Sequence, residues 1–321
     1  MSAVSDRLEA AHCLLCGAPP PAPAYTFPPY GVVRCPECGL WYLSPRLNEA
    51  AMVAAYREAS YFEGGDGPGY SSYLAQESTL RRTFRRLLRT MQRLGMTGGS
   101  GGSGGSGAGG TIRPGGPTGA VGTGGRLLEI GCAYGFFLDE AKSYFGHRAG
   151  TEFSEAGAAL ARPCADHVYV GGLEAIPDGA HGGQFDTIVL IHTIEHVYDP
   201  VRLLAGLMEH LAPGGWIVVA TPDVGGFWRP LLGRLWPFWK PPEHVAFYDA
   251  KRLAALLAKA GCREVRRMPY LSYFPLTLVR EKLTPRRSPA VAKRADEDGG
   301  ARIAVWMPAT TVAAAGRKPL G

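Results

Sequence analysis

A buried strand followed by a turn of small residues is the feature that most constrains this fold. The segment from Leu127 to Gly135 reads LLEIGCAYG, with Glu129, Gly131 and Ala133 at alternate positions before Gly135. An unbroken apolar run is typical of a strand that is covered on both faces of a parallel sheet. Small residues after the run allow a tight turn and let a ligand approach the main chain. We therefore expect an α/β sheet with a ligand site at the carboxyl ends of its strands.

The spacing of this turn decides which class of ligand it can hold. The dinucleotide fingerprint G-x-G-x-x-G fails, because its second position is Ala133 and its third is Phe136. Glu129 lies inside the strand, two residues before the first glycine, and suits a cationic ligand better than a pyrophosphate. A second acid, Glu152, ends the next apolar segment. These features together predict a nucleoside site; the alternative is a glycine-rich turn that binds nothing.

Strand and helix patterns alternate from Arg126 onward, which predicts an α/β domain. The expected strands are Leu127–Ile130, Arg148–Glu152, His167–Val170, Thr187–Ile191, Trp216–Ala220, Glu264–Met268 and Arg302–Met307. The expected helices are Gly135–Phe145, Ser154–Pro163, Pro200–Leu211 and Ala250–Ala260. Asp199 and Asp249 stand where N-caps are needed, and Gly261 stands where a helix should stop.

Four of the seven cysteines form two C-x2-C pairs near the N-terminus. Each pair lies in a knuckle, CLLCG or CPECG, whose glycine permits the turn that directs two thiolates at one ion. Four thiolates in a tetrahedral array select zinc or, less often, iron, and they leave no open position for catalysis. The alternatives are unrelated cysteines or two disulfides, but nothing indicates an oxidising compartment. We predict a structural zinc ribbon with the ligands Cys13, Cys16, Cys35 and Cys38.

Composition divides the chain into four parts. Residues 1–45 form the predicted zinc ribbon, with short strands at Tyr25–Phe27, Gly31–Arg34 and Leu40–Leu43, and residues 46–96 form a helical connector. Residues 97–125 are a flexible linker in which Gly-Gly-Ser occurs three times in succession, so this segment cannot bury a core. Residues 126–321 form the α/β domain.

The ordered motifs resemble the class I S-adenosylmethionine-dependent methyltransferases. LLEIGCAYG is similar to their first motif, FDTIVLIHTIEHVYDP to their fourth-strand segment, and LAPGGWIVVATPD to their L-x-P-G-G hairpin and fifth strand. Within that class the chain is similar to the ubiquinone-biosynthesis type, and CPECGLWYLSPR resembles the N-terminal cysteine module of many bacterial members. The resemblance implies a Rossmann-like seven-stranded sheet whose last strand is inserted antiparallel beside the sixth. It also implies S-adenosylmethionine as the methyl donor.

The resemblance assigns roles to individual positions. The loop should pass under the methionine and ribose, Glu129 should stabilise the ammonium or the loop, and Glu152 should accept hydrogen bonds from both ribose hydroxyls. The segment Gly172–Glu174 should cover the adenine. The expected cofactor-binding residues are Glu129, Gly131, Cys132, Ala133, Gly135, Glu152, Phe153, Leu173, Glu174, His192 and Thr193.

Methyl transfer from a sulfonium requires aligned reactants and, for a hydroxyl or acidic carbon, a general base. The candidates are His196 and His244, each in a Glu-His pair beyond a strand end; alternatively, both only hold loops. Residues 227–240, rich in Trp and Leu, are expected to form a lid over an apolar or aromatic acceptor or a peripheral membrane contact. The alternative is a helix packed on the body of the protein.

The formal net charge of +6 is modest, and no RNA-binding signature is present, so no nucleic-acid partner is expected. No apolar run approaches the length of a membrane span, and the N-terminus does not resemble a signal peptide, which predicts a cytoplasmic location. We expect methyl transfer to an oxygen or carbon atom of a small acceptor. The alternatives are a sugar-nucleotide methyltransferase and a zinc-ribbon scaffold with an inactive fold. The oligomeric state is not predicted.

Overall fold

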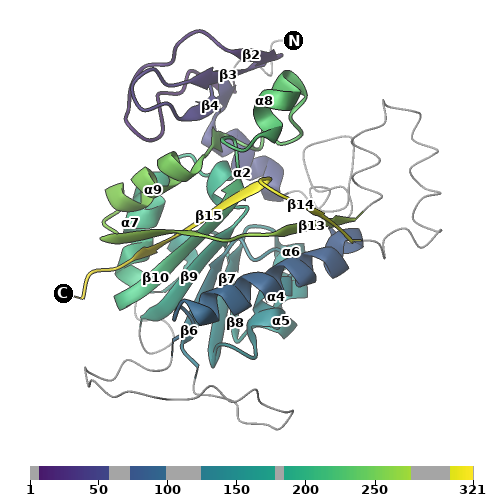
Figure 1. Cartoon of the computed structure of the whole chain (residues 1–321), viewed down its shortest axis with the longest axis vertical. Helices are drawn as coiled ribbons and strands as arrows, with labels where there is room; N and C mark the ends of the chain where they lie inside the picture. Colours follow the sequence, from purple (N-terminus) through teal and green to yellow (C-terminus); the bar gives the residue numbers. More distant parts are fainter. Residues whose placement is uncertain (1–6, 58–72, 99–123, 178–183, 276–303, 321) are drawn as a thin grey trace.

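The computed structural model describes residues 7–57, 73–98, 124–177, 184–275 and 304–320 (Figure 1). Most of the predicted linker lies outside these ranges. Its two ends are described and meet, since the backbone N–H of Gly125 donates to the carbonyl oxygen of Thr97. The predicted helical connector is described only at its ends, by α2 (Glu49–Arg57), the short helix η1 (Leu74–Gln76) and α4 (Glu77–Arg93).

A seven-stranded sheet forms the centre of the molecule, in the order β12-β15-β10-β9-β6-β7-β8. All neighbouring pairs from β10 to β8 are parallel, whereas β15 is antiparallel to both β10 and β12. This confirms the predicted α/β fold and the inserted antiparallel last strand. The strands are β6 (Arg126–Ile130), β7 (His147–Glu152), β8 (His167–Val170), β9 (Phe185–Ile191), β10 (Leu211–Pro222), β12 (Glu264–Met268) and β15 (Thr311–Arg317).

The prediction for the seventh strand was wrong. The segment Ala304–Met307 forms β14, which pairs with β13 (Ser272–Pro275) in a separate hairpin, and Thr311–Arg317 takes the place in the sheet. The true strand reads TVAAAGR, whose small residues give a weak strand pattern. Its neighbourhood requires small residues, because a Cβ on Gly316 would lie 2.5 Å from the sulfur of Cys262.

Helices cover both faces of the sheet. On one face α4 and α5 (Phe136–Ala141) bury Phe84, Leu88 and Phe137 against alternate residues of the strands. On the other face α7 (Pro200–His210) and α9 (Ala250–Lys259) bury a second set of leucines. The predicted caps are present, since the Asp199 and Asp249 side chains accept hydrogen bonds from backbone N–H groups at the starts of α7 and α9. Ser154 likewise caps α6 (Glu155–Ala161).

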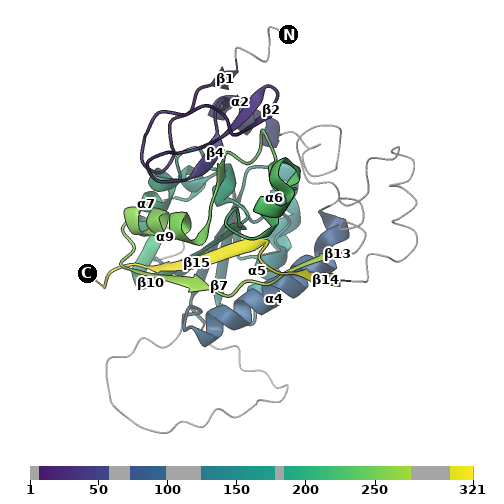
Figure 2. The ribbon, with the colours of Figure 1, turned by 45° about the horizontal axis from the view of Figure 1, so that its top comes forward.

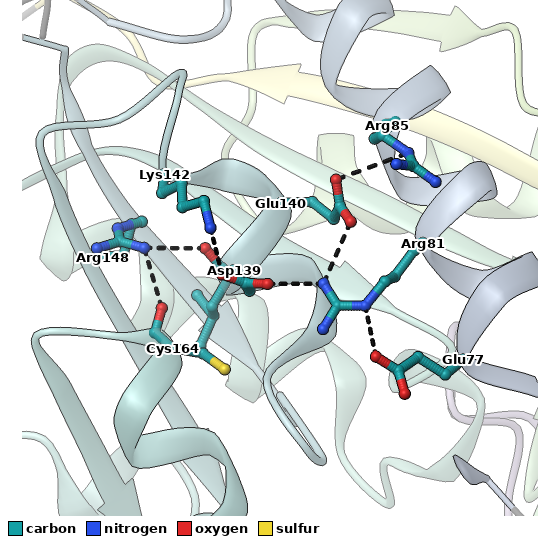
Figure 3. A network of polar contacts seen from close by, with 9 residues as sticks. Glu77, Arg81, Arg85, Asp139, Glu140, Lys142, Arg148 and Cys164 are labelled. Atoms are coloured by element: carbon teal, nitrogen blue, oxygen red, sulfur yellow. Dashed lines mark hydrogen bonds and ion pairs between the residues drawn. The ribbon is translucent and has the colours of Figure 1, made fainter.

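An arginine joins α4 to α5 (Figure 3). The Arg81 guanidinium donates to carboxylates of Glu77 at 2.7 Å, Asp139 at 2.7 Å and Glu140 at 3.2 Å. It also lies over the ring of Phe136, with the guanidinium carbon 5.0 Å from the ring centroid. Because α5 begins immediately after the glycine turn, Arg81 ties α4 to the base of that turn.

The N-terminal module shares a sheet with the α/β domain. The strands β2 (Tyr25–Phe27), β3 (Tyr30–Arg34) and β4 (Trp41–Leu43) lie close to the predicted ranges, and β1 (Leu8–Glu9) pairs with β5 (Arg46–Leu47). A strand that was not predicted, β11 (Ala246–Phe247), pairs antiparallel with β4. The module therefore sits at one end of the central sheet, as Figures 1 and 2 show.

Further contacts fix the module to the rest of the chain. The Arg252 side chain of α9 donates to the carbonyl oxygen of Cys38, and the Lys259 ammonium donates to that of Leu15, so one helix holds both cysteine knuckles. The aromatic insert, which contains α8 (Trp228–Leu232), packs on the module. Trp236 and Trp239 are buried there, and the Trp239 ring lies 5.7 Å from that of Trp41.

Candidate functional site

The glycine turn adopts a backbone that favours glycine. Gly131, Ala133 and Gly135 have φ angles of +73°, +47° and +76°. A Cβ on Gly131 would lie 2.9 Å from the hydroxyl oxygen of Thr193, so glycine is required there for space as well as for conformation. Gly135 is the N-cap of α5. The predicted loop residues are thus brought together at the carboxyl end of β6.

Glu152 holds this turn from the end of β7. One carboxylate oxygen accepts from the backbone N–H of Ala133, and the other accepts from that of Ser154, both at 2.9 Å. Burial raises the pKa of Glu152, and these backbone hydrogen bonds partly offset the rise. Each oxygen retains lone-pair capacity for a further donor. Phe153, the next residue, is partly exposed, and a Cβ on Gly172 would lie 3.2 Å from its ring.

Glu129 has a deeply buried carboxyl group. The residue is 4% exposed, and among the described residues its Oε2 atom has no hydrogen-bond partner. Burial, and then the negative charge of Glu152, hold the pKa of Glu129 well above its usual range. A buried carboxylate oxygen without a partner is costly unless a cation or a donor meets it. The residues of this turn therefore fit a ligand with a positive group, such as the ammonium of a methionine.

The segment that follows β9 lies against the turn. The Thr193 hydroxyl donates to the carbonyl oxygen of Ile130 at 3.0 Å, which joins this segment to the end of β6. The backbone N–H of His192 donates to the carbonyl oxygen of Ala220, and His192 has a φ of +53°. A side chain other than glycine in this region is strained, and such strain is concentrated at functional sites.

A buried carboxylate lies behind His192. Glu195, on the short helix η5 (Ile194–His196), is 1% exposed, and its Oε1 atom lies 3.3 Å from Nδ1 of His192. Its Oε2 atom accepts from the Thr221 hydroxyl at 2.9 Å. Burial alone would raise the pKa of Glu195, but the hydrogen bond from His192 and the charges of nearby histidines lower it to about 2. The carboxylate is therefore ionised at neutral pH.

The two predicted bases, His196 and His244, lie side by side, and His244 is more deeply buried than His192. The rings of His196 and His244 meet edge to face with centroids 4.8 Å apart. Nδ1–H of His244 donates to the carbonyl oxygen of Phe238 at 3.0 Å, and His244 is only 5% exposed. Burial, and then the charge of His196, hold the pKa of His244 well below its usual range. Burial also lowers the pKa of His196.

Two expected residues lie to one side of this site. Leu173, on the short helix η3 (Leu173–Ala175), packs toward α7, where a Cβ on Gly206 would lie 2.5 Å from its side chain. Glu174 is exposed, and its carboxylate accepts from the backbone N–H of Gly172. The backbone before this segment is joined to the site, since the N–H of Gly171 donates to the carbonyl oxygen of Glu152.

Sequence reasoning missed Tyr270, which lies between β12 and β13. Burial, and then the negative charges of Glu195 and Glu129, raise the pKa of its hydroxyl, and its side chain packs against the core cluster that contains Met268. An aromatic residue two positions after the sixth predicted strand was the available signal. Its position depends on the hairpin of β13 and β14, which the sequence patterns did not predict.

The four N-terminal cysteines form a compact group. The sulfur of Cys13 lies 3.5 Å from that of Cys38, and the sulfur of Cys16 lies 3.4 Å from that of Cys35. All four sulfurs lie within 4.8 Å of one another. Four thiolates bound to one zinc ion at about 2.3 Å stand about 3.8 Å apart, so the observed spacing fits a tetrahedral site.

Comparison with known proteins identifies the class. Residues 80–266, more than half of the chain, match the methyltransferase domain family, and the chain belongs to that family. It is an S-adenosylmethionine-dependent methyltransferase with the class I fold, as the sequence motifs predicted.

The chain is also similar to individual curated proteins and structures. It is 26% identical over 170 residues to the ubiquinone biosynthesis O-methyltransferase of Thiobacillus denitrificans, covering 49% of this chain and 72% of the relative. It is 32% identical over 159 residues to the ubiquinone biosynthesis O-methyltransferase of Cereibacter sphaeroides, covering 44% of this chain and 62% of that relative. Among solved structures, a methyltransferase of Thermotoga maritima has a TM-score of 0.45 at 21% identity, covering 77% of this chain and 92% of that one. Magnesium protoporphyrin IX methyltransferase of Synechocystis, with S-adenosylhomocysteine bound, has a TM-score of 0.47 at 10% sequence identity. The match covers 84% of this chain and 100% of that one.

Proposed function

We propose that this enzyme transfers a methyl group from S-adenosylmethionine to an oxygen or carbon atom of a small apolar or aromatic acceptor. The observation that carries the proposal is the buried Oε2 atom of Glu129, which has no partner among the described residues and lies at the glycine turn. When bound, S-adenosylmethionine supplies a methyl group on a positively charged sulfur. The enzyme itself then has to bind the two molecules, align them and remove a proton from the acceptor.

The roles of the site residues follow from their donors and acceptors. Glu129 would accept from the ammonium, and the turn from Gly131 to Gly135 would lie against the methionine and ribose. Glu152 would use its remaining lone pairs for the ribose hydroxyls while its existing hydrogen bonds keep the turn in place. Phe153, Leu173 and Glu174 would border the adenine. His192 and Thr193 would border the reacting methyl group.

The acceptor side is inferred from relatives and composition. The similar ubiquinone biosynthesis enzymes are named as O-methyltransferases, which favours an aromatic hydroxyl acceptor. Within the insert, Phe227, Leu231 and Leu235 are the exposed apolar side chains, the last being 81% exposed, whereas Trp236 and Trp239 are buried against the module. We propose that the exposed three, rather than the tryptophans, face an apolar acceptor or a membrane surface that supplies it. None of the described helices is long and apolar enough to cross a membrane.

The cysteine group would hold a structural zinc ion. Four thiolates fill a tetrahedral coordination sphere, so the ion would stabilise the module and take no part in methyl transfer. The residues that support this role are Cys13, Cys16, Cys35 and Cys38.

Calorimetry with S-adenosylhomocysteine tests the proposed cofactor site. We expect the wild-type protein to bind it, and we expect Glu129→Gln and Glu152→Ala each to weaken binding by about 1–3 kcal/mol, the cost of a lost hydrogen bond to a charged group. Glu209→Gln, at an exposed residue of α7 outside the proposed site, serves as the control and should have less effect. Unchanged affinity in both variants at Glu129 and Glu152 would refute the assignment. A mass-spectrometric screen of small aromatic hydroxyl compounds with labelled cofactor would then identify the acceptor.

A further inference from the structure

Three histidines lie near the carboxyl ends of β9 and β10, and they differ in surroundings. His244 is buried, whereas the side chain of His192 is 31% exposed. Since Nδ1–H of His244 donates to a carbonyl, only its Nε2 atom could take a proton, and the ring of His196 lies against this buried histidine. An acceptor from solvent can reach His192 more readily than His244.

The tautomer of His192 is fixed by its partner. Glu195 is ionised, so its Oε1 atom can only accept, and the contact of 3.3 Å requires the proton on Nδ1 of His192. The Nε2 atom of the neutral ring then carries a lone pair. The second oxygen of Glu195 is held by the Thr221 hydroxyl, which keeps the carboxylate from turning away.

The backbone of His192 supports a functional role. A φ of +53° at a residue with a side chain costs about 1–2 kcal/mol relative to the ordinary helical region. The strain sits beside Thr193, which contacts the end of β6 and faces the glycine turn. A glycine or asparagine would occupy this conformation more easily, so the imidazole is retained at an energetic cost.

We propose that His192 is the catalytic base toward the acceptor hydroxyl and that Glu195 is its positioning residue. This inference rests on the proposed function. The acceptor O–H proton passes to Nε2 of His192, and the freed oxygen lone pair forms a bond to the methyl carbon. The electron pair of the breaking carbon–sulfur bond remains on sulfur, which becomes a neutral thioether. The imidazolium is stabilised by the Glu195 carboxylate until the proton passes to water.

The decisive variants replace His192 by residues that accept its positive φ angle. His192→Gly and His192→Asn suit the left-handed region, so the relief of backbone strain should offset part of the lost hydrogen bond to Glu195. Both variants should fold and bind S-adenosylhomocysteine within about threefold of the wild type. With catechol and alkyl-substituted catechols as acceptor probes, both should lower kcat by about 100-fold or more. Added imidazole should restore activity to His192→Gly by about 10-fold, an effect that a merely structural histidine would not show. His167→Gln, at the amino end of the edge strand β8, is the matched control and should retain wild-type kcat.

Nuclear magnetic resonance of the imidazole nitrogens gives a test that needs no acceptor. We expect neutral His192 to carry its proton on Nδ1 in the wild type and to lose this preference in Glu195→Gln, whose kcat should fall by about 10-fold or more. A proton on Nε2 in the wild type would overturn the proposal, as would full activity in His192→Gly. If S-adenosylhomocysteine binds but no catechol is methylated, the base has no hydroxyl to serve and the proposal also fails. If the wild type does not bind S-adenosylhomocysteine, the proposed function itself is wrong.

Discussion

Glu129 is held in a state that ligand binding should change. Its raised pKa means that the free protein tends to hold a proton on this carboxyl group at pH values where an exposed glutamate is ionised. A bound ammonium would stabilise the carboxylate and lower that pKa, so the proton should leave on binding. We therefore expect S-adenosylhomocysteine to bind more tightly as the pH rises, with release of up to about one proton over the pH range in which the raised pKa keeps Glu129 protonated.

Calorimetric titration in two buffers of different ionisation enthalpy measures that proton. The observed heat should differ between the buffers for the wild-type protein and should converge for Glu129→Gln, which cannot release it. Equal heats in both buffers for the wild type would show that Glu129 does not exchange its proton for the ligand.

Ala133 has a positive φ angle, a backbone conformation that glycine adopts with less strain. Its φ of +47° is unfavourable for alanine, so Ala133→Gly should raise the free energy of unfolding by up to about 1 kcal/mol. Gly131→Ala is the opposite case, because its added Cβ would meet Thr193, and it should destabilise the protein. Chemical denaturation measures both. Destabilisation by Ala133→Gly would indicate that the alanine methyl group makes packing contacts that outweigh the strain.

At the scale of elements, Arg81 is the main polar link between α4 and α5. Arg81→Met keeps the length of the side chain but leaves Asp139 and Glu140 without this partner, and it should lower the free energy of unfolding by about 1–2 kcal/mol. Hydrogen exchange should rise in both helices. Arg89→Met, at an exposed residue of the same helix that forms no ion pair within the described part of the chain, should change stability by less than about 0.5 kcal/mol. If the two variants changed the free energy of unfolding equally, Arg81 would not link the two helices.

The sequence predicted those elements whose patterns are set locally. Six strands of the central sheet, with the caps of α7 and α9, follow from apolar runs and from side chains that bond their own neighbours. The seventh strand could not be separated from Ala304–Met307, because both segments are short and the stronger apolar pattern belongs to the outer hairpin. Strand β11 was missed because two residues carry no period, and its existence depends on the distant β4.

The candidate site was predictable to a similar degree. The motif identified the turn, and the predicted residues at the ends of β6, β7 and β9 lie around it. The pairing of His192 with Glu195 was not predicted. The sequence analysis selected His196, because it directly follows Glu195 in the sequence, and the contact of Glu195 with His192 depends on the fold of the short helix η5. Trp236 and Trp239 have helical spacing that indicates a covered face, but the sequence does not show that the N-terminal module covers it.

At the scale of the whole molecule, the cysteine module should affect the loops near the site. Val245 joins the two, since its N–H donates to the carbonyl oxygen of Glu195 and its carbonyl oxygen accepts from Leu43. Purified protein should carry about one zinc ion per chain, and Cys35→Ser should release it. Elemental analysis measures the metal, and hydrogen exchange should rise at Ala246 and Phe247 as well as in the module.

The glycine turn at the proposed cofactor site should be less affected by the loss of zinc than the N-terminal module. It is held by Glu152 and the central strands, so affinity for S-adenosylhomocysteine should stay within about threefold in Cys35→Ser. Cys164→Ser, which changes a cysteine outside the group of four, is the matched control and should keep the metal. Absence of zinc from freshly reduced wild-type protein would contradict the metal assignment.

The strand shared between module and domain also sets an order of events during synthesis. Tyr42 pairs with Ala246, which follows it by roughly 200 residues, so at about 5–20 residues per second the ribosome needs about 10–40 seconds to supply the partner of β4. Throughout that interval the hairpin of β2, β3 and β4 presents an open edge that another chain could pair with. The nascent N-terminal segment is therefore exposed to edge-to-edge association until β11 has been synthesised.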